Sequence, residues 1–305
     1  MICRHRLRTC RQTFAVCRVV TALTLAMAGA IGVQAQSSAV LRAQHVSLAP
    51  SLADNAYGRP LFLSSNEEGA RVEGDIFARI DAPFVRTSAS LQGTAQWCEI
   101  LFLHLNVKSC QGGRGAAGET IGLVVGTKHD HPEDRAYRLD FNYAVVTQQP
   151  DYIRLQLTAD EGPLGTNDYR IDVELVALDG QRSFLHLSYS YRVGLAARIA
   201  MKAYLATLGR DKVGFTQVGR QPDGQQRLVA GARGVVERNT MRYYLAIEAY
   251  LASLEQPRAR QFEQRLAEWQ TGVERYPRQL RELERAEYLA LKRNQRRGQV
   301  DISGG

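Results

Sequence analysis

The sequence predicts an α+β fold in which a curved antiparallel β-sheet wraps around a long C-terminal helix, with a further helical extension behind it. Residues 120–193 contain four runs in which apolar and polar residues alternate. Such runs are typical of antiparallel strands with one dry and one solvated face. Residues 235–254 then carry one broad apolar stripe at helical spacing. A stripe of that width indicates a helix that lies across the dry face of the sheet.

Residues 1–35 have the composition of a secretory signal peptide. Five arginines precede the apolar run 19–33, and Val33-Gln34-Ala35 places small residues at the cleavage positions. The run is shorter than the roughly 20 residues that a membrane-spanning helix needs. We therefore expect cleavage after Ala35 and a periplasmic or secreted mature protein. An uncleaved N-terminal anchor is the alternative.

The positive charge of the chain is concentrated at its two ends. Removing the five arginines of the signal lowers the formal net charge from +8 to +3. Residues 256–297 hold 11 basic and 6 acidic side chains, a net charge of +5. The remaining chain is nearly neutral, which argues against a nucleic-acid partner. The segment 256–297 could contact an anionic membrane surface or a partner protein, and a solvated helix is the alternative reading.

Cys98 and Cys110 are the only cysteines that remain after the signal is removed. An even pair in an oxidising compartment favours a disulfide. Two buried free thiols are the alternative, because spacing alone does not establish a bridge.

The elements before the meander are predicted from local patterns. Residues 36–72 read as an N-terminal arm without periodicity, and residues 74–80 alternate as a first strand. Asp81-Ala82-Pro83 suits a helix start. Helical material continues to about Val107, and the glycine-rich residues 111–118 predict a flexible loop.

The elements after the meander complete the expected organisation. A helix is expected over 195–208, and Pro222-Asp223-Gly224 predicts a hairpin turn. We assign residues 73–255 to one α+β domain and residues 256–305 to a basic charged helical tail.

The order of these elements resembles a known superfamily. A strand, a helix pair closing on Trp97, an antiparallel meander and a long amphipathic terminal helix follow one another over residues 70–255. This order is similar to the helix-grip fold of the START and polyketide-cyclase-like (SRPBCC) superfamily. The resemblance rests on architecture and transfers no residue roles. It implies a cavity between the sheet and the last helix that holds a lipid or another apolar ligand. The helix 195–208 and the tail from 256 depart from the pattern.

Two groups of side chains are candidate ligand contacts. Five tyrosines share the dry face of the meander, and buried hydroxyls need partners, which suits a semi-polar cavity. They are Tyr137, Tyr143, Tyr169, Tyr189 and Tyr191. Ordinary core packing with hydroxyls at the rim is the alternative. At the start of the long helix, Arg238, Asn239, Arg242 and Tyr243 could grip an anionic headgroup. Surface ion pairs with Glu237 are the blander reading, and the one we favour.

The sequence assigns no catalytic residue, metal or cofactor. His129-Asp130-His131 offers too few converging ligands for an ion, His104 reads as a packing residue, and His186 reads as a surface residue. We therefore expect an exported protein that binds a lipid or another hydrophobic small molecule in a cavity between sheet and helix. The alternatives are an envelope scaffold that acts through its basic tail and an enzyme of the cyclase or hydrolase type.

Overall fold

The structure is a computed structural model that describes residues 38–116, 118–126, 136–194, 198–199, 203 and 212–303. The expected signal peptide and the His129-Asp130-His131 loop lie outside the described residues, as does nearly all of the helix expected over 195–208. Within the described ranges, no helix is long and apolar enough to cross a membrane. The boundaries of the expected domain and tail remain predictions.

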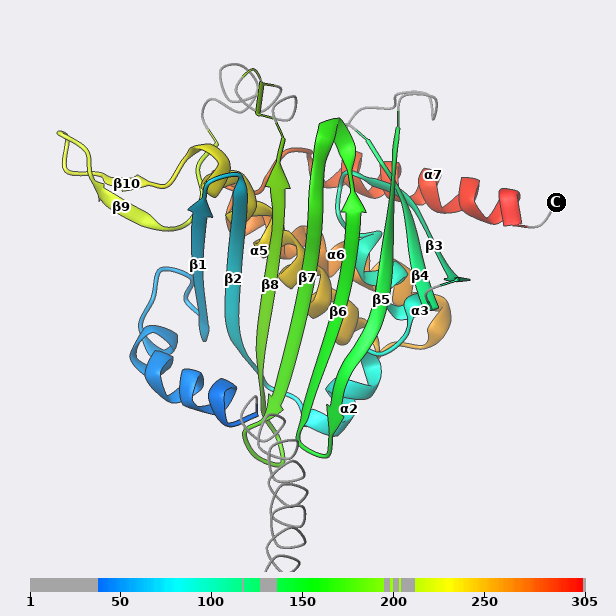
Figure 1. Ribbon diagram of the computed structural model, residues 1–305, viewed down its shortest axis with the longest axis horizontal. Helices are drawn as coiled ribbons and strands as arrows, with labels where there is room; N and C mark the ends of the chain where they lie inside the picture. The colour runs from blue at the N-terminus through cyan, green and yellow to red at the C-terminus, as the bar shows by residue number, and fades with distance from the viewer. Residues whose placement is uncertain are drawn as a thin grey trace, which may run out of the picture.

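An eight-stranded antiparallel sheet forms the centre of the protein (Figure 1). Its strands follow the order β1-β2-β8-β7-β6-β5-β4-β3, so the hairpin β1–β2 joins the meander beside its last strand. The strands are β1 Leu61–Glu68, β2 Arg71–Ile80, β3 Val107–Gly115, β4 Gly118–Val125, β5 Tyr137–Gln149, β6 Tyr152–Glu161, β7 Thr166–Ala177 and β8 Ser183–Val193. A short 3₁₀ turn, Pro163–Gly165, precedes β7.

The long helix α5, Gly231–Ser253, crosses one face of this sheet. It contacts β1, β2 and β8, and its residue Ile247 is fully buried in the main core. The approach to β2 is close because Gly74 has no side chain, and a Cβ there would lie 2.5 Å from Thr240 Oγ1. The predicted fold class, a sheet that wraps a long helix, is therefore confirmed.

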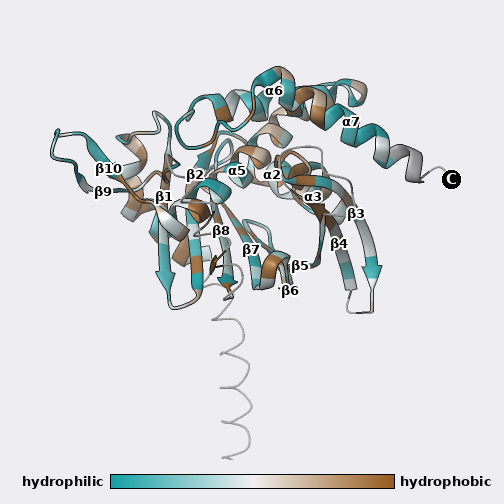
Figure 2. Cartoon of the chain, turned by 90° about the horizontal axis from the view of Figure 1, so that it is seen from above, coloured by the Kyte–Doolittle hydropathy of each residue, from teal (hydrophilic) through white to brown (hydrophobic). Residues whose placement is uncertain are grey.

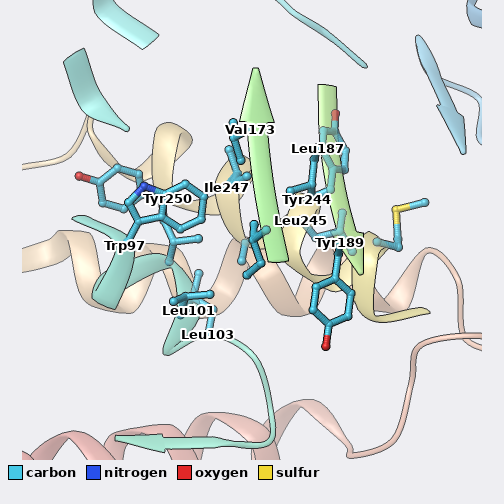
Figure 3. Packing of buried hydrophobic residues seen from close by; sticks show 14 of the residues in the cluster. Trp97, Leu101, Leu103, Val173, Leu187, Tyr189, Tyr244, Leu245, Ile247 and Tyr250 are labelled. Atoms are coloured by element: carbon cyan, nitrogen blue, oxygen red, sulfur yellow. The ribbon is translucent and has the colours of Figure 1, made fainter. Parts of the chain in front are cut away.

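Two short helices, α2 Phe84–Ser90 and α3 Thr94–Leu101, cover the same face of the sheet. Trp97 of α3 and Leu187 of β8 belong to the core that these helices share with α5 (Figure 3). Apolar side chains at alternate strand positions supply the sheet side of this core, as the sequence pattern requires.

The C-terminal helices α6, Arg258–Glu274, and α7, Arg285–Ser303, form a further layer on the outer side of α5 (Figure 2). Their apolar seam is buried within the protein. Trp269 of α6 stacks on Tyr288 of α7 at a ring distance of 4.7 Å, and its indole N–H donates to Arg242 O of α5 at 3.2 Å. These helices share one core with the sheet.

The N-terminal segment packs on the rest of the protein, as expected of an arm, but it has a regular structure that the sequence showed no periodicity for. Residues 38–53 form a helix, and β1 follows it. The helix lies on the face of the sheet opposite α5, where Leu41, Leu48 and Leu52 pack against Phe184. The buried leucines follow helical spacing, but exposed apolar residues such as Val40 and Val46 lie between them and obscured the helical period in the sequence.

The glycine-rich stretch 111–118 is also corrected by the structure. Its described residues, 111–116 and 118, belong to the hairpin of β3 and β4, in which Gln111 pairs with Gly122 and Gly115 pairs with Gly118. Backbone pairing with β4, and the contact of Gly112 with Thr94, order a segment that side chains alone would leave loose. The hairpin predicted around Pro222-Asp223-Gly224 is present, as β9 Gln217–Arg220 and β10 Gln226–Leu228.

Candidate functional site

Four tyrosines gather between the sheet and α5. Tyr169 comes from β7, Tyr189 and Tyr191 from β8, and Tyr243 from α5. We call them the tyrosine cluster. Alternation along the strands places the first three on the face that α5 covers. Ring centroids are 5.2 Å apart for Tyr169 and Tyr191, 5.5 Å for Tyr189 and Tyr191, and 5.1 Å for Tyr189 and Tyr243.

The hydroxyls of the tyrosine cluster bond locally. The hydroxyls of Tyr169 and Thr166 lie 2.7 Å apart, and Tyr189 and Tyr243 bond to each other. Burial raises the pKa of Tyr189 well above its usual value, and it raises the pKa of Tyr243 as well. These hydroxyls therefore stay protonated. Tyr243 and the neighbouring Asn239 are only partly buried, which distinguishes this end of the cluster from closed core.

The other two predicted tyrosines serve different ends. Tyr143 is buried, but its hydroxyl accepts the backbone N–H of Gly93 at 2.9 Å and so holds the turn between α2 and α3. Tyr137 is 43% exposed, which corrects its expected place on the buried face. The cause is its position as the first residue of β5, where it pairs with the last residue of β4. Phe141, which was not predicted as a site residue, packs edge-on against Tyr169, with the two ring centroids 6.4 Å apart.

The expectation of surface ion pairs around Glu237 is wrong, because Glu237, Arg238 and Arg242 are only 0%, 2% and 4% exposed. The Glu237 carboxylate accepts the Ser65 hydroxyl at 2.6 Å. It also accepts the backbone N–H groups of Phe215 and Thr216 at 2.5 and 2.9 Å. The hydrogen bonds of Glu237 therefore connect α5 to β1 and to the segment before β9.

The two predicted arginines differ in what they face. Arg242 is paired with the Glu282 carboxylate and donates to Leu280 O at 3.2 Å, so it fastens α5 to the segment between α6 and α7. Arg238 donates to Val213 O at 3.4 Å and lies near the tyrosine cluster. Burial raises the pKa of the Tyr191 hydroxyl, and the charge of Arg238 opposes that rise.

His104 is a feature of this site that sequence reasoning placed in the core without a role. Its ring lies 5.2 Å from the Tyr243 ring, and its side chain is buried. Nδ1 accepts the N–H of Asn106 at 3.2 Å. Nε2 makes no hydrogen bond of good geometry within the described part of the chain, although the side chain of Asn239 lies within reach of the ring and opposes the fall of its pKa. Burial, followed by the charges of Arg242 and Lys292, lowers the pKa of His104 to about 3. The imidazole is therefore neutral.

Helix α7 holds the turn that carries His104. Three of its side chains donate to backbone carbonyls of residues 103–108. Tyr288 Oη donates to Leu103 O at 2.9 Å, Lys292 Nζ to His104 O at 2.8 Å and Val107 O at 2.6 Å, and Gln299 Nε2 to Lys108 O at 3.2 Å. The three donors recur at helical spacing and so form one stripe of α7. None of these contacts has a local sequence signal.

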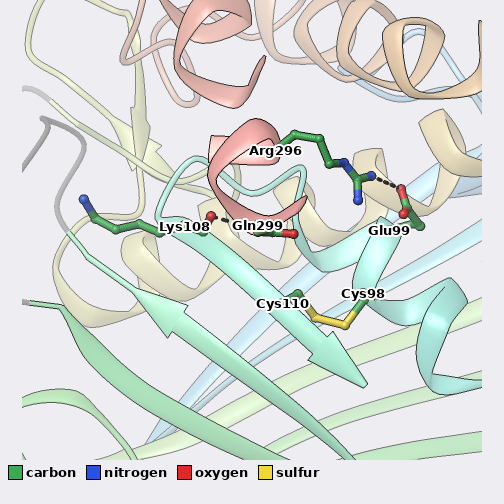
Figure 4. Close-up of a disulfide and its surroundings, with 6 residues drawn as sticks. All are labelled: Cys98, Glu99, Lys108, Cys110, Arg296 and Gln299. Atoms are coloured by element: carbon green, nitrogen blue, oxygen red, sulfur yellow. Dashed lines mark hydrogen bonds and ion pairs between the residues drawn. A yellow bond between two sulfur atoms is a disulfide. The ribbon is translucent and has the colours of Figure 1, made fainter. Parts of the chain in front are cut away.

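The predicted disulfide lies beside this turn (Figure 4). Cys98 of α3 and Cys110 of β3 are bonded through their sulfurs, with their Cα atoms 5.3 Å apart. Arg296 of α7 pairs with Glu99, the residue next to Cys98. The disulfide and α7 therefore fix the same turn from two sides.

A separate groove of about 610 Å³ lies where the end of β2 meets α2, α5 and α6. Ile80, Leu245 and Ala252 supply apolar surface to it. Its charged residues include both ion pairs Arg59–Glu248 and Arg86–Glu255. None of the predicted site residues lines this groove, and its arginines and carboxylates are balanced.

On the opposite face of the sheet, His186 is partly exposed, as a residue of the polar face, and it takes part in a network of hydrogen bonds that the sequence did not predict. Its Nε2 lies 2.9 Å from Asp75 Oδ1, and its Nδ1 lies 2.9 Å from Glu174 Oε2. Phe77 stacks on the imidazole at 4.2 Å. Within the described ranges, no group of histidine, cysteine and acidic side chains could hold a metal ion.

Comparisons with known proteins agree with this architecture only at a distance. No family model and no curated protein matches the chain. Similar solved structures include a START superfamily protein from Mycobacterium smegmatis, 14% identical, with 47% of this chain and 93% of that chain covered and a TM-score of 0.29. Norcoclaurine synthase from Thalictrum flavum, in complex with dopamine and hydroxybenzaldehyde, is 13% identical, with coverage of 47% and 87% and a TM-score of 0.31.

The protein Ara h 8.0201 is 10% identical, with coverage of 63% of this chain and 99% of that chain and a TM-score of 0.33. Such low identities and TM-scores carry no argument about function. The class of the protein follows from its own architecture. An antiparallel sheet wrapped around a long helix is the helix-grip arrangement.

Proposed function

We propose that this protein is exported and binds a lipid or another hydrophobic small molecule between the sheet and α5, at the tyrosine cluster. The observation that supports this proposal is that Tyr243 is partly exposed to solvent while the other tyrosines of the cluster are buried. Asn239, which lies beside Tyr243 on α5, is partly exposed as well. Ligand sites combine apolar and aromatic walls with a few oriented polar groups. Tyrosines at this position offer both, because each ring presents apolar faces and a hydroxyl.

A scaffold that acts through the C-terminal tail has less support. The apolar side chains of α6 and α7 are used inside the protein, where Leu266 and Trp269 belong to the main core. Arg293 pairs with Glu263, and Arg296 pairs with Glu99. The surface left to a partner is therefore smaller than the sequence suggested.

Titration with the neutral apolar fluorophore N-phenyl-1-naphthylamine tests the site. Tyr243→Ala removes a ring from the cluster and is expected to weaken binding on the order of tenfold. Ala252→Trp fills the separate groove from an exposed position and is expected to leave the affinity unchanged. Circular dichroism of both variants checks that the fold is kept.

Two results would contradict the proposal. One is an unmodified protein that binds no probe and emerges free of small molecules when it is purified from its natural host and measured by native mass spectrometry. The other is loss of binding in Ala252→Trp with full affinity in Tyr243→Ala, which would move the site to the groove.

A further inference from the structure

His104 presents an unused hydrogen-bond donor beside the tyrosine cluster. Buried polar atoms in folded proteins are nearly always paired, so an exception calls for an explanation. Only 4% of His104 is exposed, and within the described ranges its Nε2 atom makes no hydrogen bond of good geometry, although the Asn239 side chain lies within reach of the ring. The same residue is otherwise fully engaged, because its carbonyl accepts Lys292 Nζ and its Nδ1 accepts the N–H of Asn106.

The bonding of Nδ1 fixes which nitrogen carries the proton. A backbone N–H can only donate, so Nδ1 of His104 must be the acceptor in its bond to Asn106. The proton of the neutral ring is then on Nε2. Because burial and two nearby cations lower the pKa of His104 to about 3, this tautomer persists at neutral pH. Nε2–H is thus a permanent, uncharged donor.

The surroundings of His104 select the kind of group that could accept this proton. Arg242 is already paired with Glu282, and Lys292 is held by two carbonyl oxygens, so neither is set up to receive a ligand anion. Burying an unpaired carboxylate costs far more than burying a neutral oxygen. The rings of Tyr243 and Tyr189 continue from His104 as an apolar path.

We propose that the ligand of the tyrosine cluster carries an uncharged oxygen acceptor, a carbonyl or a hydroxyl, which accepts the proton of His104 Nε2 while its apolar body lies against Tyr243 and Tyr189. This inference rests on the proposed function and makes it more specific. The ligand class is a neutral, oxygenated hydrophobic molecule, in contrast to a pure hydrocarbon or a cationic amphiphile.

A matched pair of probes tests this inference. The ketone 6-propionyl-2-(dimethylamino)naphthalene carries the acceptor, and its propyl analogue has a methylene group in place of the carbonyl. The measured quantity is the ratio of the two dissociation constants in each protein. Comparing ratios between variants cancels the intrinsic difference in hydrophobicity between the probes.

Two substitutions separate the nitrogens of His104. His104→Asn places an oxygen near the Nδ1 position and keeps an acceptor for Asn106, but it removes the Nε2 donor. His104→Gln places an amide donor near the Nε2 position. We expect the preference for the ketone to fall about three- to tenfold in His104→Asn, the range of one hydrogen bond, and to survive in His104→Gln. The affinity for the propyl analogue should change little in either.

The outcomes distinguish the two levels of the proposal. An unchanged ratio in His104→Asn, with both probes bound by the unmodified protein, overturns the role of His104 and leaves the tyrosine cluster as a binding site. Failure of the unmodified protein to bind either probe overturns the proposed function and this inference with it. A loss of both affinities together in His104→Asn shows a structural role only, and also overturns the inference.

Discussion

At the scale of single residues, His186 shows how neighbouring carboxylates decide the charge of a partly buried ring. Burial alone would lower the pKa of His186, but its hydrogen bonds to Asp75 and Glu174 outweigh that effect and raise the pKa to about 9. Burial would likewise raise the pKa of Glu174, and its bonds to His186 and Tyr152 lower it instead. The network therefore holds a charged imidazolium against a carboxylate at neutral pH.

This network predicts a pH dependence of stability. A histidine whose pKa is raised on folding stabilises the protein fully below its unfolded value near 6.5, and that contribution disappears as the pH passes about 9. From pH 6.5 to 9.5, the destabilisation caused by His186→Gln should therefore shrink by on the order of 2–3 kcal/mol. Urea denaturation of both proteins at several pH values measures this difference.

His45→Gln is the matched control for the His186 experiment. Burial, followed by the charges of Arg182 and Arg79, lowers the pKa of His45, so this residue stabilises the fold above pH 6.5 and titrates only at lower pH. Its effect should change only slightly between pH 6.5 and 7.5 and be constant from there to pH 9.5. A constant effect of His186→Gln over the same range would contradict the charged network.

Lys292 is the second residue with a large expected effect. Replacing it with methionine keeps the volume but leaves His104 O and Val107 O without their buried donor. We expect Lys292→Met to lower the free energy of unfolding by about 1–3 kcal/mol. Arg293→Met, at the next position but in an exposed ion pair with Glu263, should cost less than about 1 kcal/mol. Equal effects of the two substitutions would show that the buried amine is not what holds α7.

At the scale of elements, the turn at residues 103–108 depends on segments from distant parts of the chain. The disulfide joins α3 to β3 across the turn, and the donors of α7 hold its carbonyls. Local backbone hydrogen bonds, such as His104 N–H to Leu101 O, begin the turn. The tertiary contacts add to these local bonds and hold the backbone on both sides of His104.

Removing the disulfide tests its share in this arrangement. The double variant Cys98→Ser, Cys110→Ser is expected to lose about 3 kcal/mol, because a crosslink over a short loop restricts the unfolded chain. Guanidinium unfolding measures the loss. The unmodified protein should show the same loss when dithiothreitol is added, and the double variant should not respond to the reductant. If neither the double substitution nor the reductant changes the free energy of unfolding, the disulfide does not stabilise the fold.

The element scale also shows where sequence reasoning succeeded. The alternation of apolar and polar residues predicted β5 to β8 and their buried faces well. Only one face of this sheet faces the core, so every second residue of a strand is apolar. The alternation missed β3, since the glycines at 112 and 113 have no side chains to alternate. The sequence also suggested that Glu237 and Arg242 are surface charges. Their partners, Ser65 and Glu282, are far away in the sequence and could not be predicted from it.

At the scale of the whole molecule, ligand binding and stability are linked. A ligand that binds only the folded state at a hundred times its dissociation constant stabilises the protein by about 2.7 kcal/mol. For a chain of this size, the corresponding rise in Tm is roughly 5–10 °C. Differential scanning calorimetry with the naphthyl ketone should show that rise in the unmodified protein and a smaller one in Tyr243→Ala at the same probe concentration. If fluorescence titration shows binding but Tm does not rise, the probe binds surfaces that also exist in the unfolded chain.

The placement of the hairpin β1–β2 sets the order of events during synthesis. Gly74 of β2 pairs with Tyr189 of β8, so the first strands made find their neighbour only after the meander has been completed. Until then, the hairpin exposes one unpaired edge and the apolar side chains that will face α5. Pairings of such long range make folding slow and leave nascent chains open to aggregation. A holding chaperone that shields the newly made hairpin would therefore raise the yield of folded protein.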